Sequence, residues 1–231
     1  MDTTAINKAR IIYYGLFSSL FSFSMGKKKY ETIVNAVDLL QRNPIDEQSE
    51  KALSNMKRRL AKGGYAALQN ECDRVFYSPT TSLVPMTASY YHEQRDDGHK
   101  RVEMINYVLE SKFRRNAKIF KEHEDHIEFV MQFLQQLLNE EVQGDTAARQ
   151  LAAKVFANIL NEMVDEFADK LFRHEKSYFY KQVVLALRSF IDFERVYLNI
   201  SKPEKKRILT SREVEQAKGK DKDRQCIQLS S

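Results

Sequence analysis

The chain has 231 residues, of which 42% are hydrophobic and 30% are charged, and its formal net charge is +5 at pH 7. These proportions suit one globular domain with a core of its own. Seven Gly, four Pro and two Cys are too few for a turn-rich sheet fold, a disulfide framework or a cysteine zinc site, and no apolar run approaches the roughly 20 residues that span a bilayer.

Apolar residues spaced by about 3.6 positions predict a series of long helices, separated by glycines and prolines. The expected helices cover residues 4–25, 28–41, 46–61, 65–76, 100–113, 125–139, 145–171 and 177–199. The most regular pattern is a four-residue step of apolar side chains at Leu151, Val155, Ile159, Met163, Phe167 and Leu171. Since no segment alternates like a strand, the sequence predicts an all-α fold, a single-domain bundle over residues 1–200.

The first expected helix also has features of an export signal. Residues 9–25 are largely apolar, follow Lys8 and include Arg10. A signal peptide combines a basic start, a short apolar run and a small-residue cleavage site. This segment is rich in bulky aromatic residues with helical spacing, so a buried first helix is favoured over a cleaved signal.

Residues 76–98 form the loop with the most distinctive chemistry. They include Pro79, Pro85, several hydroxyl side chains and the adjacent pair Tyr90 and Tyr91. Loops of this length without regular structure are uncommon and are often functional. This loop is therefore a candidate binding segment.

The string EHEDH at residues 122–126 concentrates three acids and two histidines. A metal site is one interpretation, because His123 and His126 would share a helical face and Glu122 lies four residues before His126. A helix cap is another, with Asp125 accepting hydrogen bonds from the amides of the first turn, but it leaves His126 without a role. The third is a docking site, where neutral His126 presents a donor and an acceptor to a partner.

Motifs of common enzyme classes are absent from the sequence, which has no GxSxG, HExxH, GxxxxGK[ST] or GxGxxG string. Cys72 lies on an apolar helical face, which is typical of packing. With Cys226 far away in sequence, it indicates a reducing compartment. These absences leave an all-α metal-dependent hydrolase using His123, Asp125 and His126 as the enzymatic alternative.

Residues 201–231 carry nine Lys or Arg and five Asp or Glu, so most of the net positive charge lies in this tail. We expect a flexible end or an extended, frayed helix there. A basic-tailed nucleic-acid adaptor is a further alternative, whereas the favoured interpretation expects no nucleic acid and no stable insertion into a membrane.

Two strings of the sequence carry a family resemblance: YAALQNECDRVFYSPTTSLVPMTASYY at residues 65–91 and EHEDHIEFV at residues 122–130. Together they resemble the TorD/DmsD/NarJ-like cytoplasmic redox-enzyme maturation chaperone family, whose pattern is Phe-x-Gly-Pro, a second Pro and a Ser with aromatics, and later Glu-Pro-x-Asp-His. The matching residues are Phe76, Pro79, Pro85, Ser89, Tyr90, Tyr91, Glu122, Asp125 and His126. The sequence departs from the pattern at Ser78 in place of Gly, at His123 in place of Pro, and at Thr87 in place of a frequent Trp or Glu.

The resemblance implies a cytoplasmic chaperone, a monomer or dimer, without a catalytic site, cofactor or metal. Such proteins bind the twin-arginine signal peptide and the apo-form of a molybdenum or tungsten oxidoreductase, assist cofactor insertion and prevent premature export. By this resemblance the nine matching residues form the partner-binding surface. Glu122, Glu124 and Asp125 would meet the arginines of the peptide, His126 would belong to the rim, and Phe76 with the two tyrosines would line the apolar part.

Overall fold

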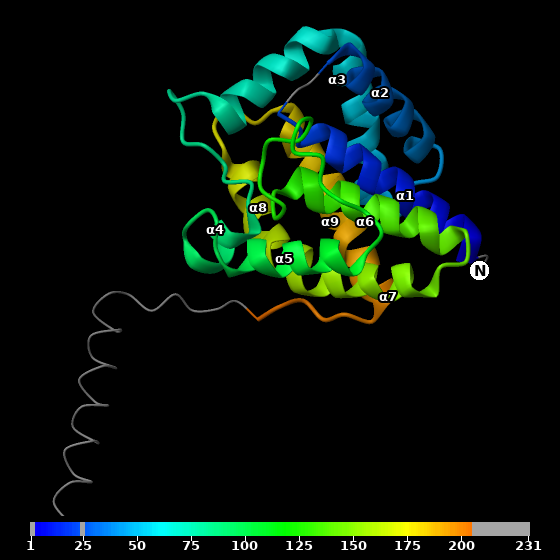
Figure 1. Cartoon of the computed structure of the whole chain (residues 1–231). Helices are drawn as coiled ribbons and strands as arrows, with labels where there is room; N and C mark the ends of the chain where they lie inside the picture. The colour runs from blue at the N-terminus through cyan, green and yellow to red at the C-terminus, as the bar shows by residue number, and fades with distance from the viewer. Residues whose placement is uncertain (1–2, 24–25, 205–231) are drawn as a thin grey trace, which may run out of the picture.

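The computed structural model describes residues 3–23 and 26–204, and Figure 1 shows them as a bundle of helices. In chain order the elements are α1 (Thr3–Leu20), α2 (Lys27–Gln41), α3 (Glu47–Cys72), the π-helix η1 (Asp73–Tyr77), α4 (Ala88–Glu93), α5 (His99–Glu110), α6 (Ile127–Val142), α7 (Thr146–Val155), the π-helix η2 (Phe156–Leu160), α8 (Asn161–Arg173) and α9 (Phe179–Leu198). These residues contain no strand, which confirms the all-α prediction, and none of their helices is long and apolar enough to cross a membrane. Most of the basic tail, from residue 205 on, lies outside the described residues.

Helix α1 lies between α2 and α6 and packs lengthwise against α6, while α3 packs along α9 (Figure 1). The aromatic face of α1 is buried, and Tyr14 and Phe17 have no exposed surface. The rings of Tyr13 and Tyr14 lie 4.8 and 4.9 Å from that of Phe190 on α9. The expectation of a buried first helix is met, because bulky rings suit a core helix.

A buried ion pair joins the middle of α1 to α9. Arg10 donates to the two carboxylate oxygens of Glu194 at 2.6 and 2.9 Å, and Tyr14 donates its hydroxyl to the same carboxylate at 2.6 Å. The guanidinium also lies 4.6 Å from the centre of the Tyr197 ring. Arg10, which gives this segment its signal-like basic start, is therefore a structural residue whose charge is paired inside the protein.

The four-residue apolar step of residues 151–171 is built as α7, η2 and α8 in one continuous run. On a regular α-helix each step of four turns about 40° past a full circle, so the apolar stripe would wind around the helix. The π-helix η2 has more residues per turn and reduces this drift, and all six apolar residues of the pattern are buried. Its wide turn also leaves the Asn158 carbonyl to accept from Lys100 Nζ of α5 at 2.7 Å.

Several helix ends differ from the prediction because tertiary partners replace helical ones. Helix α1 ends at Leu20 rather than Met25, since the Tyr180 hydroxyl donates to the Leu20 carbonyl at 2.7 Å. The break expected at residues 63–64 is a kink within α3, where Gly64 has φ 63°, in the left-handed region that favours glycine. The helix expected over 100–113 ends at Glu110, and the loop 76–98 contains the short helix α4.

Candidate functional site

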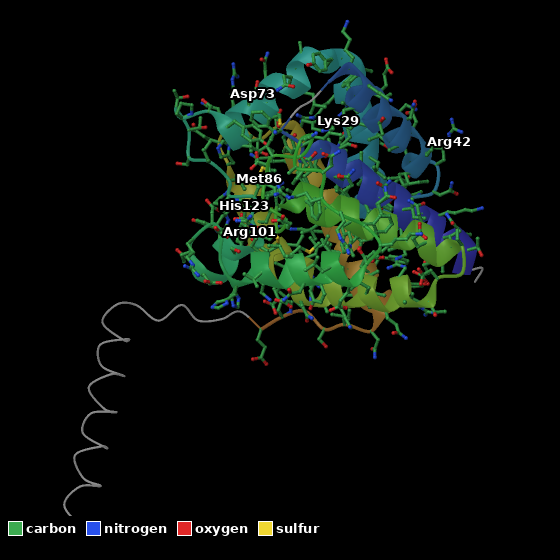
Figure 2. All side chains as sticks on the ribbon, in the orientation of Figure 1. Lys29, Arg42, Asp73, Met86, Arg101 and His123 are labelled. Atoms are coloured by element: carbon green, nitrogen blue, oxygen red, sulfur yellow. The ribbon has the colours of Figure 1, made fainter. Side chains whose placement is uncertain are left out.

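The loop 76–98 and the acidic turn 122–126 lie side by side. The Ala88 amide donates to the Asp125 carbonyl at 3.0 Å, and the Ile127 amide donates to the Met86 carbonyl at 2.8 Å. Thr87 and His126 thereby form an isolated antiparallel bridge. Figure 2 labels Met86, His123 and Arg101 in this one region of the molecule. The two segments that the resemblance assigned to one surface are thus neighbours in space.

Asp125 is fully buried and holds the start of α4. Its Oδ2 accepts from the Ser89 amide at 2.8 Å, and its Oδ1 has no hydrogen-bond partner within the described residues. Ser89 is buried as well, and its hydroxyl accepts from the Arg101 amide at 3.2 Å. The expectation that Asp125 caps the helix that follows it is therefore wrong: it binds the amide of a helix that precedes it by 36 residues.

His126 is the residue that caps α6. Its Nδ1 accepts from the Glu128 amide at 3.2 Å, and only 3% of its surface is exposed. Burial, together with nearby His123, lowers the pKa of His126 to about 4, so the ring is neutral at pH 7 and its Nδ1 can accept. The expectation that His126 presents donors and acceptors to an outside partner is wrong, because the ring is enclosed and one nitrogen is already used.

Glu124 is paired twice inside the protein. Its Oε2 accepts from Arg101 Nε at 3.1 Å, and its Oε1 lies 2.7 Å from Arg115 Nε. Burial raises the pKa of Glu124, but backbone and arginine hydrogen bonds outweigh it and hold that pKa below its usual value. A client arginine can bind this carboxylate only by replacing one of the two arginines already present.

Glu122 is half-buried, whereas Glu124 and Asp125 are buried, and its carboxylate forms no ion pair with any cation of the described residues. It lines a groove of about 360 Å³ between α1, α2, α6 and the segment before the acidic turn. The apolar side of this groove is lined by Phe23, Ile119 and Phe120. Phe23 is 59% exposed, Ile119 is 81% exposed and Phe120 is half-buried. Lys29 and Glu128 line the same groove and pair with each other at 3.2 Å.

The predicted aromatic residues lie elsewhere. Phe76 is 4% exposed and packs edge-to-face on Phe21 and Tyr180 in the core. The Tyr91 hydroxyl donates to the Pro85 carbonyl at 2.7 Å, and Tyr90 lies under Lys170 Nζ at 5.9 Å. Pro79 is exposed in the loop. Of the nine residues that match the family pattern, only Glu122 lines the groove.

Helical periodicity does not indicate the residues on the apolar side of this groove. Phe23 follows the buried part of α1, and Ile119 and Phe120 form an apolar pair inside the otherwise charged segment 114–122. Such a pair outside any helix pattern is the signal that could have identified them.

The structure does not support the metal-dependent hydrolase. Within the described residues no three His, Cys, Asp or Glu side chains are arranged to hold a metal ion. Asp125 is turned toward Ser89, and His126 uses Nδ1 in its cap. Burial raises the pKa of the Cys72 thiol to about 11, as expected for a packed thiol rather than a nucleophile.

Comparison with known proteins gives one family and one fold. The sequence pattern of the family described as nitrate reductase delta subunit matches residues 42–173, more than half of the chain. A crystal structure from Archaeoglobus fulgidus, of a protein assigned to redox enzyme maturation, has the same fold with a TM-score of 0.54. It is 22% identical in sequence, and the match covers 80% of this chain and 93% of that one. No curated protein matches the chain.

The matched region contains both strings on which the resemblance rested, and the groove-lining segment 119–122 lies inside it. The resemblance is thereby confirmed. The chain belongs to the nitrate reductase delta subunit family, which comprises NarJ- and TorD-type chaperones of redox-enzyme maturation.

Proposed function

We propose that this protein is a cytoplasmic chaperone that binds the twin-arginine signal peptide and the apo-form of a molybdenum or tungsten oxidoreductase. In this role it assists cofactor insertion and prevents premature export. Membership of a family of maturation chaperones supports the general role. The groove beside Glu122 supports the binding of a peptide.

One observation carries the proposal: the groove joins an unpaired carboxylate to exposed apolar side chains. A signal peptide offers the complementary pattern, two cations followed by an apolar stretch. Glu122 would accept an arginine side chain, and Phe23, Ile119 and Phe120 would contact the apolar residues. The volume of about 360 Å³ is near the lower end of roughly 300–1,000 Å³ for ligand sites, so it suits a few side chains of a peptide rather than the whole segment.

This proposal assigns new roles to the residues of the family pattern. Asp125, Ser89 and His126 fix the acidic turn against α4 and α6 through buried hydrogen bonds. They would act on peptide binding indirectly, by holding Glu122 at the edge of the groove. Substituting any of these three residues is expected to reduce stability as well as peptide binding, whereas substituting Glu122 should reduce binding alone.

The test is direct binding of a synthetic peptide that carries two adjacent arginines and an apolar stretch, measured by fluorescence anisotropy. Glu122→Gln should weaken binding by roughly 5-fold, as expected for one partly exposed ion pair worth about 1 kcal/mol. Ile119→Ser should weaken it by a similar factor through lost apolar contact. Neither variant should change the melting temperature appreciably.

Glu47→Gln is the matched control, because Glu47 is an exposed glutamate at the start of α3 that pairs with Lys51. A peptide in which both arginines are replaced by glutamine removes the positive charge from the peptide, and it should bind more weakly than the twin-arginine peptide. The proposal fails if the protein binds neither peptide, or if Glu122→Gln and Glu47→Gln bind equally well.

A further inference from the structure

The segment between α5 and α6 itself carries two adjacent arginines followed by apolar residues. Its sequence is KFRRNAKIFKE, residues 112–122, with Arg114 and Arg115 ahead of Ile119 and Phe120. Figure 1 draws it as the loop that connects α5 to α6. The Phe113 ring lies 6.3 Å from that of Phe133, and the Phe120 ring lies 5.3 Å from that of Phe129, so the segment runs along one face of α6.

Arg115 already occupies an arginine site in the acidic turn. Its Nε lies 2.7 Å from Glu124 Oε1, and its Nη1 donates to the carbonyls of Glu122 and Phe120 at 2.9 and 3.3 Å. A carboxylate flanked by carbonyl oxygens is the set of acceptors that a guanidinium group prefers. The next apolar residues of the same segment, Ile119 and Phe120, form a wall of the groove.

The segment is held to the rest of the protein by side chains alone. In the part of the chain that the structure describes, the amides of Phe113, Lys118, Ile119 and Phe120 donate to acceptors between residues 111 and 116. The attachments to the acidic turn and α6 are therefore two ion pairs, Arg115 with Glu124 and Lys112 with Glu140, and ring contacts. Segments attached in this way open at a lower free energy than helices do.

We propose that Arg115 is an internal substitute for one of the client's two arginines. Residues 112–118 hold Arg115 in the arginine site at Glu124 until a client arginine displaces it, while Ile119, Phe120 and Glu122 remain as the wall of the groove. This inference rests on the proposed function and extends it: the empty chaperone is partly self-blocked, and client binding exchanges one arginine for another.

Competition of this kind lowers the apparent affinity by the fraction of molecules in which the segment is released. Arg115→Gln removes the internal cation and should tighten binding of the synthetic twin-arginine peptide, by about 10-fold if a tenth of the molecules are open. Arg114→Gln is the matched control, because Arg114 donates to carbonyls of its own turn, those of Val108, Ser111 and Phe113. It should leave the affinity unchanged.

A second measurement does not depend on a variant. Hydrogen–deuterium exchange of the unmodified protein, with and without the peptide, reports directly on residues 112–118, which hold Arg115. Displacement predicts faster exchange of this segment when peptide binds, together with slower exchange of α1 and α6.

The outcomes separate this inference from the proposed function. If the peptide binds but residues 112–118 become protected, Arg115 is not released by the client and the inference is overturned. Equal or weaker binding by Arg115→Gln also overturns it while leaving the chaperone role intact. If neither the unmodified protein nor Arg115→Gln binds the peptide, the proposed function fails as well.

Discussion

Asp125 offers the sharpest test of how the acidic turn works. Replacing it by alanine removes the acceptor of the Ser89 amide, a hydrogen bond of 2.8 Å between two residues with no exposed surface. Hydrogen bonds to charged groups contribute about 1.5–3 kcal/mol, and a buried donor left without a partner keeps its desolvation cost. Since water cannot reach Ser89, we expect Asp125→Ala to lower the free energy of unfolding by about 2–3 kcal/mol.

Asp145 provides the matched control. It caps α7 by accepting from the Ala148 amide at 3.0 Å, so residue type and role are the same, but it is exposed to solvent. Water can replace its carboxylate, and Asp145→Ala should cost only about 0.5–1 kcal/mol. Asp125→Asn should fall between the two, because the amide oxygen can still accept from Ser89.

The assay is urea unfolding followed by circular dichroism, with thermal melting as a second measurement. For a protein of this size about 2–4 °C in melting temperature corresponds to 1 kcal/mol, so Asp125→Ala should lower it by about 5–10 °C. The midpoint in urea should shift without a change of slope. If Asp125→Ala costs no more than Asp145→Ala, the structural role is refuted. If it reduces peptide affinity at unchanged stability, Asp125 contacts the client directly.

Two further predictions concern buried charge. Burial lowers the pKa of His126 from 6.5 to about 4, so only the unfolded imidazole takes up a proton as the pH falls through 6.5. The contribution of His126 to the free energy of unfolding is therefore complete above pH 6.5 and decreases toward pH 4, by on the order of 2 kcal/mol at pH 5. His126→Asn keeps a capping acceptor but does not titrate, so it should remove this loss when urea unfolding is compared at pH 7 and pH 5. Glu194→Leu should lower the free energy of unfolding by about 3–5 kcal/mol, because Arg10 remains buried without its partner. The double variant Arg10→Met/Glu194→Leu should recover part of this loss. If both variants lose the same stability, Arg10 finds another partner.

Periodicity predicted the helices well but not their irregular turns. All six apolar residues of the four-residue step at 151–171 are buried, as the pattern predicts. The same pattern also contains the reason for a π-helix, since a repeat of four does not fit 3.6 residues per turn. Taken alone, the pattern predicts one regular helix. Local spacing could not place η2, because the turn is also fixed by a partner far away in sequence, Lys100, which binds the Asn158 carbonyl.

The acidic turn was found from the sequence, but the role of each acid in it was not. Acids in a short charged string are usually exposed, and nothing local distinguishes Glu122, which lines a groove, from Glu124 and Asp125, which are buried. The difference is made by Ser89, 36 residues before Asp125, and by Arg101, 23 residues before Glu124. Only the folded chain brings these partners to the turn.

The pairing of Glu124 changes what binding should look like in salt. If all three acids of the turn met the client arginines, binding would be strongly sensitive to salt. If a client arginine replaces Arg115 at Glu124, the number of ion pairs there stays the same, and the one new pair is that of Glu122. Salt weakens exposed pairs by screening, so raising the salt from 50 to 500 mM should reduce affinity only a few-fold.

Arg115→Gln then becomes the decisive comparison. Without the internal arginine, an incoming guanidinium makes a new pair with Glu124 as well as with Glu122, so the salt dependence should become steeper while the affinity at low salt rises. Arg114→Gln should show the salt dependence of the unmodified protein, because Arg114 donates to carbonyls of its own turn. A slope that is the same in all three proteins would mean that the client never reaches Glu124, and that the groove beside Glu122 binds its peptide without any exchange of arginines.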